Sequence, residues 1–165
     1  MLTEWILAAA MATLTAFVHL LCLGILVRVL RFREHLFRRL RIMPQMLLFA
    51  GVLGIVIVHA LEIWLYALLY VQLQAVSQLE QALYFSIVTY STLGYGDVLL
   101  PHEWRILGAT EGPVGVIMLG WSTAFLISLL SQTKLLGEDW LAAPSAAPKA
   151  RILRLGKSKK TKGNR

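Results

Sequence analysis

Three long runs of apolar residues dominate the pattern along the chain, at residues 5–27, 46–71 and 106–130. Each exceeds the roughly 20 residues that an α-helix needs to cross about 30 Å of hydrocarbon. The first run follows Glu4 and lacks the basic start and small-residue cleavage site of a signal peptide, so we expect it to stay in the protein. The pattern therefore predicts three membrane-spanning helices.

A shorter apolar segment, QLQAVSQLEQALYFSIVTY, lies between the second and third runs. Ser77 is placed to cap a helix, Glu80 follows at the third position of a capping box, and about three helical turns come next. Such a helix is too short to cross a membrane. It leads directly into STLGYGD, whose two glycines permit backbone conformations closed to other residues, so that successive carbonyls can point the same way.

Non-helical backbone at membrane depth is tolerated only inside protein or along a water-filled cavity. We therefore expect a re-entrant helix followed by a backbone segment that borders an aqueous path. The carbonyl end of the half-helix carries partial negative charge, which stabilises a cation and repels an anion. An ordinary glycine turn between two helices is the alternative, but it does not explain the half-length helix.

Composition and charge agree with a membrane protein and suggest its orientation. Hydrophobic residues make up 58% of the chain and charged residues 15%. The basic residues are concentrated in two blocks, at 28–41 and 149–165, which flank apolar runs as topology signals do, so we expect no nucleic-acid partner. The positive-inside rule then places the N-terminus outside and the C-terminus in the cytoplasm of a multi-pass cell-membrane (inner or plasma membrane) protein.

The basic blocks also allow other interpretations. Adhesion of the first block to anionic lipid headgroups is a less favoured alternative to a pure topology role. A voltage sensor is disfavoured because the arginines lie outside the span. Cys22 is the only cysteine, so neither a disulfide framework nor a zinc site is expected. His19 and His59 have no second ligand at metal spacing, and we expect buried hydrogen-bonded histidines, no transition-metal site and no organic cofactor.

The sequence TLGYGD at residues 92–97 resembles the selectivity filter of potassium channels, whose pattern is Thr-x-Gly-Tyr-Gly-Asp. With the short helix and the flanking spans, residues 46–131 resemble the small prokaryotic two-helix-pore potassium channel family. The resemblance implies a homotetramer in which potassium, as the permeant ion, is bound by the Thr92 hydroxyl and by the carbonyls of Thr92, Leu93, Gly94 and Tyr95. It also implies that Gly96 and Asp97 close the outer mouth. Leu93 replaces the commoner valine or isoleucine, with little expected effect because its side chain points into the wall.

The predicted fold class is an all-α integral membrane protein, with three transmembrane helices and a re-entrant pore helix and filter between the second and third. The predicted domains are an extra transmembrane helix with a basic loop (1–41), the pore domain (42–136) and a basic, flexible tail (137–165). The predicted function is passive conduction of potassium, not catalysis. A weakly selective cation channel and a non-conducting regulatory protein that binds a partner or anionic lipid are the alternatives.

Two groups inside the spans are further candidates. Gly115 lies about where the family's inner helix has its hinge glycine, and Pro113 removes a backbone hydrogen bond to Ala109; close helix packing is the alternative role. If Gly115 faces the pore axis, then the same stripe carries Leu119, Thr123 and Ile127.

Glu62 and Glu111 are carboxyls in apolar spans at similar depth, and His59 stands one turn from Glu62. Ser86 of the pore helix is a candidate donor to such a carboxyl. We predict that His59, Glu62 and Glu111 form a polar cluster that holds the filter's shape and couples it to pH. The alternative is that each carboxyl separately bonds local backbone.

Overall fold

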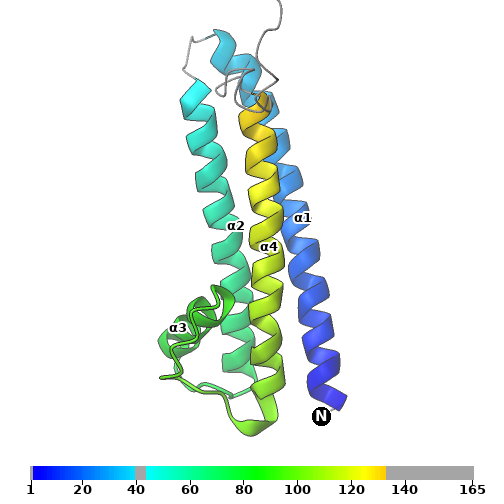
Figure 1. Cartoon of the computed structure of the whole chain (residues 1–165), viewed down its shortest axis with the longest axis vertical. Helices are drawn as coiled ribbons and strands as arrows, with labels where there is room; N and C mark the ends of the chain where they lie inside the picture. The colour runs from blue at the N-terminus through cyan, green and yellow to red at the C-terminus, as the bar shows by residue number, and fades with distance from the viewer. Residues whose placement is uncertain (1, 40–43, 133–165) are drawn as a thin grey trace, which may run out of the picture. The chain divides into compact units, whose positions relative to one another are not determined.

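The computed structural model describes residues 2–39 and 44–132, which contain four α-helices and one short 3-10 helix. In chain order they are α1 (Leu2–Arg39), α2 (Pro44–Gln72), α3 (Leu79–Tyr90), η1 (His102–Trp104) and α4 (Arg105–Gln132) (Figure 1). Three segments are long and apolar enough to cross a membrane, at Leu2–Leu30, Leu48–Gln72 and His102–Ser131. The predicted all-α membrane fold is therefore confirmed.

The first helix is longer than the sequence pattern suggested. Residues 25–43 contain neither glycine nor proline, so nothing in the chain stops a helix at the end of the apolar run, and α1 continues to Arg39. The prediction of a loop over 28–41 is therefore wrong as far as Arg39. A helix of 38 residues rises about 57 Å, more than the roughly 30 Å of hydrocarbon. Arg41 and the predicted tail at 137–165 lie outside the described residues.

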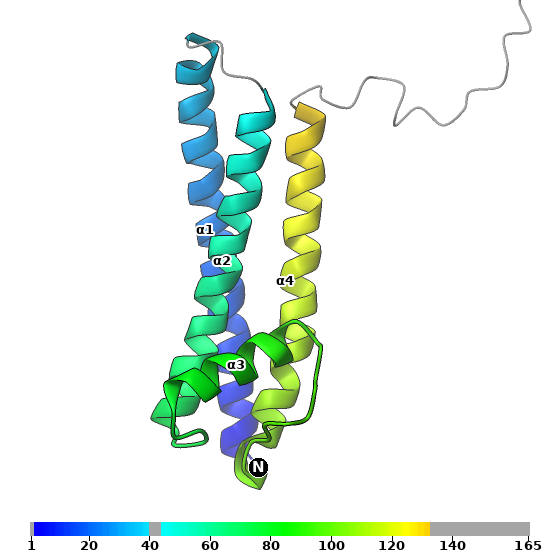
Figure 2. The same cartoon turned by 90° about the vertical axis from the view of Figure 1, so that its left-hand side faces the viewer.

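Helices α1, α2 and α4 run side by side, and α1 packs against both of the others (Figures 1 and 2). Helix α2 begins at Pro44, as its missing N–H allows for a first helical residue. The N-terminal end of α1 lies at the same end of the three helices as α3 (Figure 1). Helix α3 packs against α2 and α4, so it lies among the helices that frame the predicted pore.

Helix α3 has 12 residues and is followed by irregular backbone, as a re-entrant segment requires. It begins at Leu79 after Gln78, whose side chain makes no capping hydrogen bond, so the prediction that Ser77 caps it is wrong. The cause lies in the preceding turn, where Gln74 adopts a φ of 54° and the amides of Ala75 and Val76 bond to the carbonyl of Tyr70. The carbonyl of Gln78 then accepts the first hydrogen bond of α3, from the amide of Ala82.

The described residues expose many large apolar side chains. Phe17, Phe49 and Val56 are 63%, 65% and 58% exposed, and in each of the three apolar segments under a third of the residues are buried. A protein in water rarely shows apolar patches of this extent. Lipid or neighbouring subunits must cover these surfaces, and the chain is a multi-pass membrane protein.

Candidate functional site: a filter segment and two buried polar clusters

Backbone conformation alternates along the segment after α3. Thr92, Gly94 and Gly96 have φ values of 60°, 57° and 74°, whereas Leu93 and Tyr95 between them have ordinary negative values. Backbone in which residues of positive φ alternate with residues of negative φ can turn successive N–H groups to one side of the chain. Glycine adopts a positive φ at no steric cost, which is the physical reason for its presence at 94 and 96.

The amide side of this segment faces α3. The amide of Thr92 donates to the Thr89 carbonyl at 2.9 Å, and those of Leu93 and Gly94 donate to the Val88 carbonyl at 2.9 and 3.2 Å. No hydrogen bond from the described part of the chain ends on a carbonyl of residues 92–96, and residues 91–97 are all exposed. The result is a row of open backbone acceptors, which suits a cation and offers nothing to an anion.

The outer end of the segment is tied to α3 by a side-chain contact. Tyr84 donates a hydrogen bond of 2.5 Å to Asp97, and the amide of Val98 donates to the other carboxylate oxygen at 3.0 Å. The Tyr84 hydrogen bond holds the pKa of Asp97 below its usual value and raises that of the Tyr84 hydroxyl. Asp97 is therefore an anion at neutral pH and links the end of this segment to α3.

The inner end of the segment rests against α4 through a glycine. A side chain on Gly115 would overlap the carbonyl oxygen of Tyr90 and lie 3.0 Å from its carbonyl carbon. This contact gives Gly115 a packing role, while a hinge at Gly115 and Pro113 stays a prediction. Gly115 is buried, whereas the other members of the expected stripe, Leu119, Thr123 and Ile127, are exposed.

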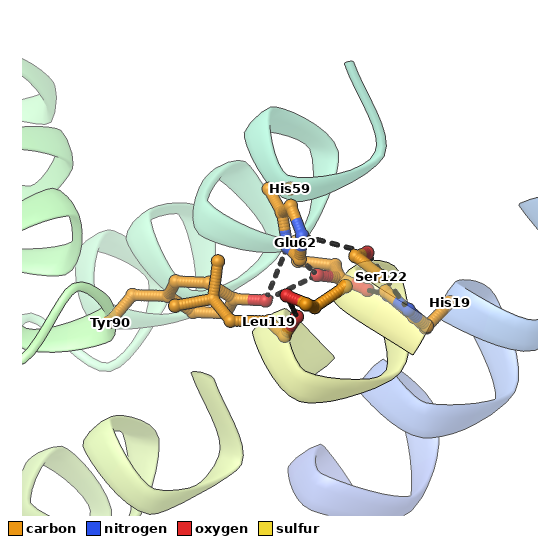
Figure 3. Close-up of polar contacts among 7 residues, drawn as sticks. His19, His59, Glu62, Tyr90, Leu119 and Ser122 are labelled. Atoms are coloured by element: carbon orange, nitrogen blue, oxygen red, sulfur yellow. Dashed lines mark hydrogen bonds and ion pairs between the residues drawn. The ribbon is translucent and has the colours of Figure 1, made fainter. Parts of the chain in front are cut away.

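A buried polar cluster, the Glu62 cluster, joins all four α-helices and consists of His19, His59, Glu62, Tyr90 and Ser122 (Figure 3). The two oxygens of Glu62 lie 2.8 Å from Nδ1 of His19 and 3.1 Å from Nδ1 of His59. Tyr90, at the end of α3, donates to Glu62 at 2.5 Å and lies 2.9 Å from His59.

Glu111 belongs to a second group. Its two oxygens accept hydrogen bonds from Ser86 of α3, at 2.5 Å, and from Tyr70 of α2, at 2.6 Å. Ser86 also lies 3.0 Å from the carbonyl of Ile63. The structure thus brings His59 and Glu62 together but places Glu111 with other partners, so the three residues do not form one cluster. Each group includes one residue of α3, Tyr90 in the first and Ser86 in the second.

Sequence reasoning missed several members of these groups. His19, on α1, and His59 each have neighbours of a type that can bind metal. One possible ligand atom from each of His19, His59 and Glu62 lies within 4.8 Å of the others. The expectation that neither histidine has such a partner is therefore wrong. The His-x-x-Glu spacing at 59–62 was a usable signal for one pair, but the contact with His19 depends on how α1 packs.

Comparison with protein-family models matches residues 46–132, more than half of the chain, to a family described as ion channel. The match covers α3, the segment after it and the two helices that pack against α3. Neither a search of the curated proteins nor a search of the solved structures gave a significant match. Apart from His19 on α1, the residues of the site lie within the matched region, and the chain belongs to this ion channel family.

Proposed function

We propose that four copies of the chain surround a central axis and form a channel that conducts potassium passively and discriminates against sodium. The observation that carries the proposal is the row of open carbonyls at residues 92–96, held by amides that bond to α3. Four such rows around an axis would offer rings of oxygen ligands in place of the water around potassium. Residues 92–95 are the proposed binding sites for the ion.

Exposure in the single chain supports the assembly. Leu93 and Tyr95 are 57% and 66% exposed, although both lie in a segment that is expected at membrane depth. One chain supplies one row of carbonyls, whereas a cation stripped of water needs ligands on all sides. Neighbouring copies related by a closed symmetry would both complete the ring and cover these side chains.

Selectivity requires rows that keep their spacing. We propose that the Tyr84–Asp97 contact holds the outer end, that Gly115 supports the inner end, and that the Glu111 and Glu62 groups brace α3. Helix α3 ends where the segment begins, so its carbonyl end adds partial negative charge beside the proposed ion path. A looser support would give the weakly selective channel that is the nearest rival.

The proposed orientation has the N-terminus outside and the C-terminus in the cytoplasm of the cell membrane. The positive-inside rule supports it, and so does the position of the N-terminal end of α1 at the end of the helices where α3 lies. A tag at the C-terminus should be accessible only after the cells are opened. Labelling of that tag on intact cells would contradict the orientation.

Function is tested with purified protein in liposomes loaded with potassium. Potassium or rubidium should exchange rapidly, sodium should exchange far more slowly, and the protein should run as a tetramer in mild detergent. Equal sodium exchange would favour the weakly selective alternative. A tetramer without any flux would favour the regulatory alternative, in which the basic segments bind a partner or anionic lipid.

A further inference from the structure

We propose that the Glu62 cluster is a binding site for a divalent transition-metal ion, with zinc as the expected occupant. The proposed ligands are Nδ1 of His19, Nδ1 of His59 and the carboxylate of Glu62, and the Tyr90 hydroxyl, 2.5 Å from Glu62 and 2.9 Å from His59, is the candidate fourth ligand (Figure 3). Imidazole and carboxylate are ordinary zinc ligands, and side chains on facing helices often build such sites.

Charge is the first reason for a cation at this position. Glu62 is fully buried in a helix that is apolar enough to span a membrane, and an isolated carboxylate there is costly. Both ion pairs that Glu62 makes within the described residues are with histidines, which are neutral unless protonated. A metal ion, a proton on one imidazole or a proton on Glu62 itself would offset this cost, and a metal ion is the one of the three that also uses both histidines as ligands.

Distances are close to those of a coordination sphere. Two ligands about 2.1 Å from zinc, at the tetrahedral angle, lie about 3.4 Å apart. The two histidine nitrogens lie 2.8 and 3.1 Å from the Glu62 oxygens, and all three ligand groups fall within 4.8 Å. To hold a metal ion, the two short separations would lengthen by about 0.3–0.6 Å, and a separation at the 4.8 Å limit would shorten by about 1.4 Å, through rotation of the side chains.

The tautomers of His19 and His59 give a second reason to expect a metal ion in the Glu62 cluster. The Nε2 atoms of His59 and His19 lie 3.0 and 3.5 Å from the Ser122 hydroxyl oxygen. If both Nδ1 atoms bind metal, both Nε2 atoms carry protons, and the two lone pairs of Ser122 can accept both. Without metal and with Glu62 ionised, Ser122 can serve both Nε2 atoms only if the Tyr90 hydroxyl donates to Nδ1 of His59, and Tyr90 then gives up its 2.5 Å hydrogen bond to Glu62.

The position of the site indicates what the metal would do. Its ligands come from α1 and α2, Tyr90 ends α3, and Ser122 belongs to α4, so an ion here would fasten the extra helix α1 to the pore domain. Tyr90 is two residues before Thr92, which begins the filter segment. His59 keeps 11% of its side chain exposed, whereas His19 and Glu62 are fully buried, so entry is expected from the His59 side.

Metal content of the purified full chain tests the site without any need for conduction. The protein is prepared without chelators, and zinc, iron, nickel and cobalt are measured by mass spectrometry. We expect one metal ion per chain in the wild type and a loss of at least tenfold in both His19→Gln and His59→Gln. The matched control is His102→Gln, which removes an exposed histidine next to α4 and should keep the metal.

Two measurements keep the test decisive if the ligand variants do not fold. Wild-type protein stripped with a chelator and given cobalt should show the visible absorption bands of a tetrahedral cobalt site. Ser122→Ala, which keeps every ligand, should lower zinc affinity about 10- to 100-fold. The proposal would be overturned if the wild-type protein holds no metal, gives no cobalt absorption bands and keeps the same melting temperature when zinc is added. Protonation within the cluster would then be what offsets the buried charge of Glu62.

Discussion

Gly115→Ala is expected to separate the end of α3 from α4. The added methyl group would overlap the Tyr90 carbonyl oxygen, lie 3.0 Å from the carbonyl carbon and lie 3.1 Å from the ring. Two of these atoms belong to the backbone, so a side-chain rotation does not relieve the clash. Overpacking of this kind typically costs about 1–3 kcal/mol. Because the backbone of Tyr90 cannot rotate out of the way, we expect a cost near the top of that range, about 3 kcal/mol. The better helix propensity of alanine returns about 1 kcal/mol, for a net loss of about 2 kcal/mol.

Gly120→Ala is the matched control on the same helix, because an added methyl group there meets nothing within 4 Å in the chain. It should gain about 1 kcal/mol, as should Gly24→Ala on α1, which is also open. The difference between the Gly115 and Gly120 variants is then about 3 kcal/mol, or about 6–12 °C in melting temperature for a chain of this size. Thermal melting of the purified protein in one detergent measures it. Equal melting temperatures for the two variants would refute the packing contact.

Three further changes test the supports of the filter segment. Tyr84→Phe removes the hydrogen bond that lowers the pKa of Asp97. This bond stabilises the fold fully at pH values above 3.8, the usual pKa of the carboxyl, and its contribution is lost as the pH falls through the lowered pKa. In the variant Asp97 is protonated at a higher pH, so the loss of flux in acid should also occur at a higher pH. Unchanged acid sensitivity would oppose this. Glu111→Gln leaves one acceptor oxygen for Tyr70 and Ser86, at a cost of about 1–3 kcal/mol, and should alter potassium preference or the pH profile of flux; wild-type behaviour in both would disprove the coupling. Gly94→Ala strains a residue with a φ of 57° by about 1–2 kcal/mol and should reduce potassium preference, measured as the potassium-to-sodium flux ratio; an unchanged ratio would count against the proposed filter.

Much of the fold could be predicted because the bilayer imposes strong constraints on sequence. Runs of 20 or more apolar residues indicated the three spans, and the half-length run with its glycine segment indicated a re-entrant helix. Boundaries were less well defined, since hydropathy marks where the lipid ends and not where a helix ends. Helix α1 therefore passes through its basic residues to Arg39, and α3 begins after Gln78 and not with a Ser77 cap.

The two buried clusters show what the sequence could not supply. Glu62 and Glu111 stood out because carboxyls are costly in apolar spans, and His59 lay one helical turn from Glu62. Partners on other helices depend on rotation and packing, which no local pattern encodes. Similar depth suggested one cluster, but the helices direct Glu111 toward Ser86 and Glu62 toward His19.

The most direct test of the central claim is the reversal potential of the purified protein in a planar bilayer with potassium on one side and sodium on the other. Rings formed from the carbonyls of residues 92–95 should favour potassium by well over tenfold, which is more than about 1.4 kcal/mol between the two ions. The reversal potential should then lie close to the potassium equilibrium value. A reversal potential near zero, with current carried equally by both ions, would contradict the account.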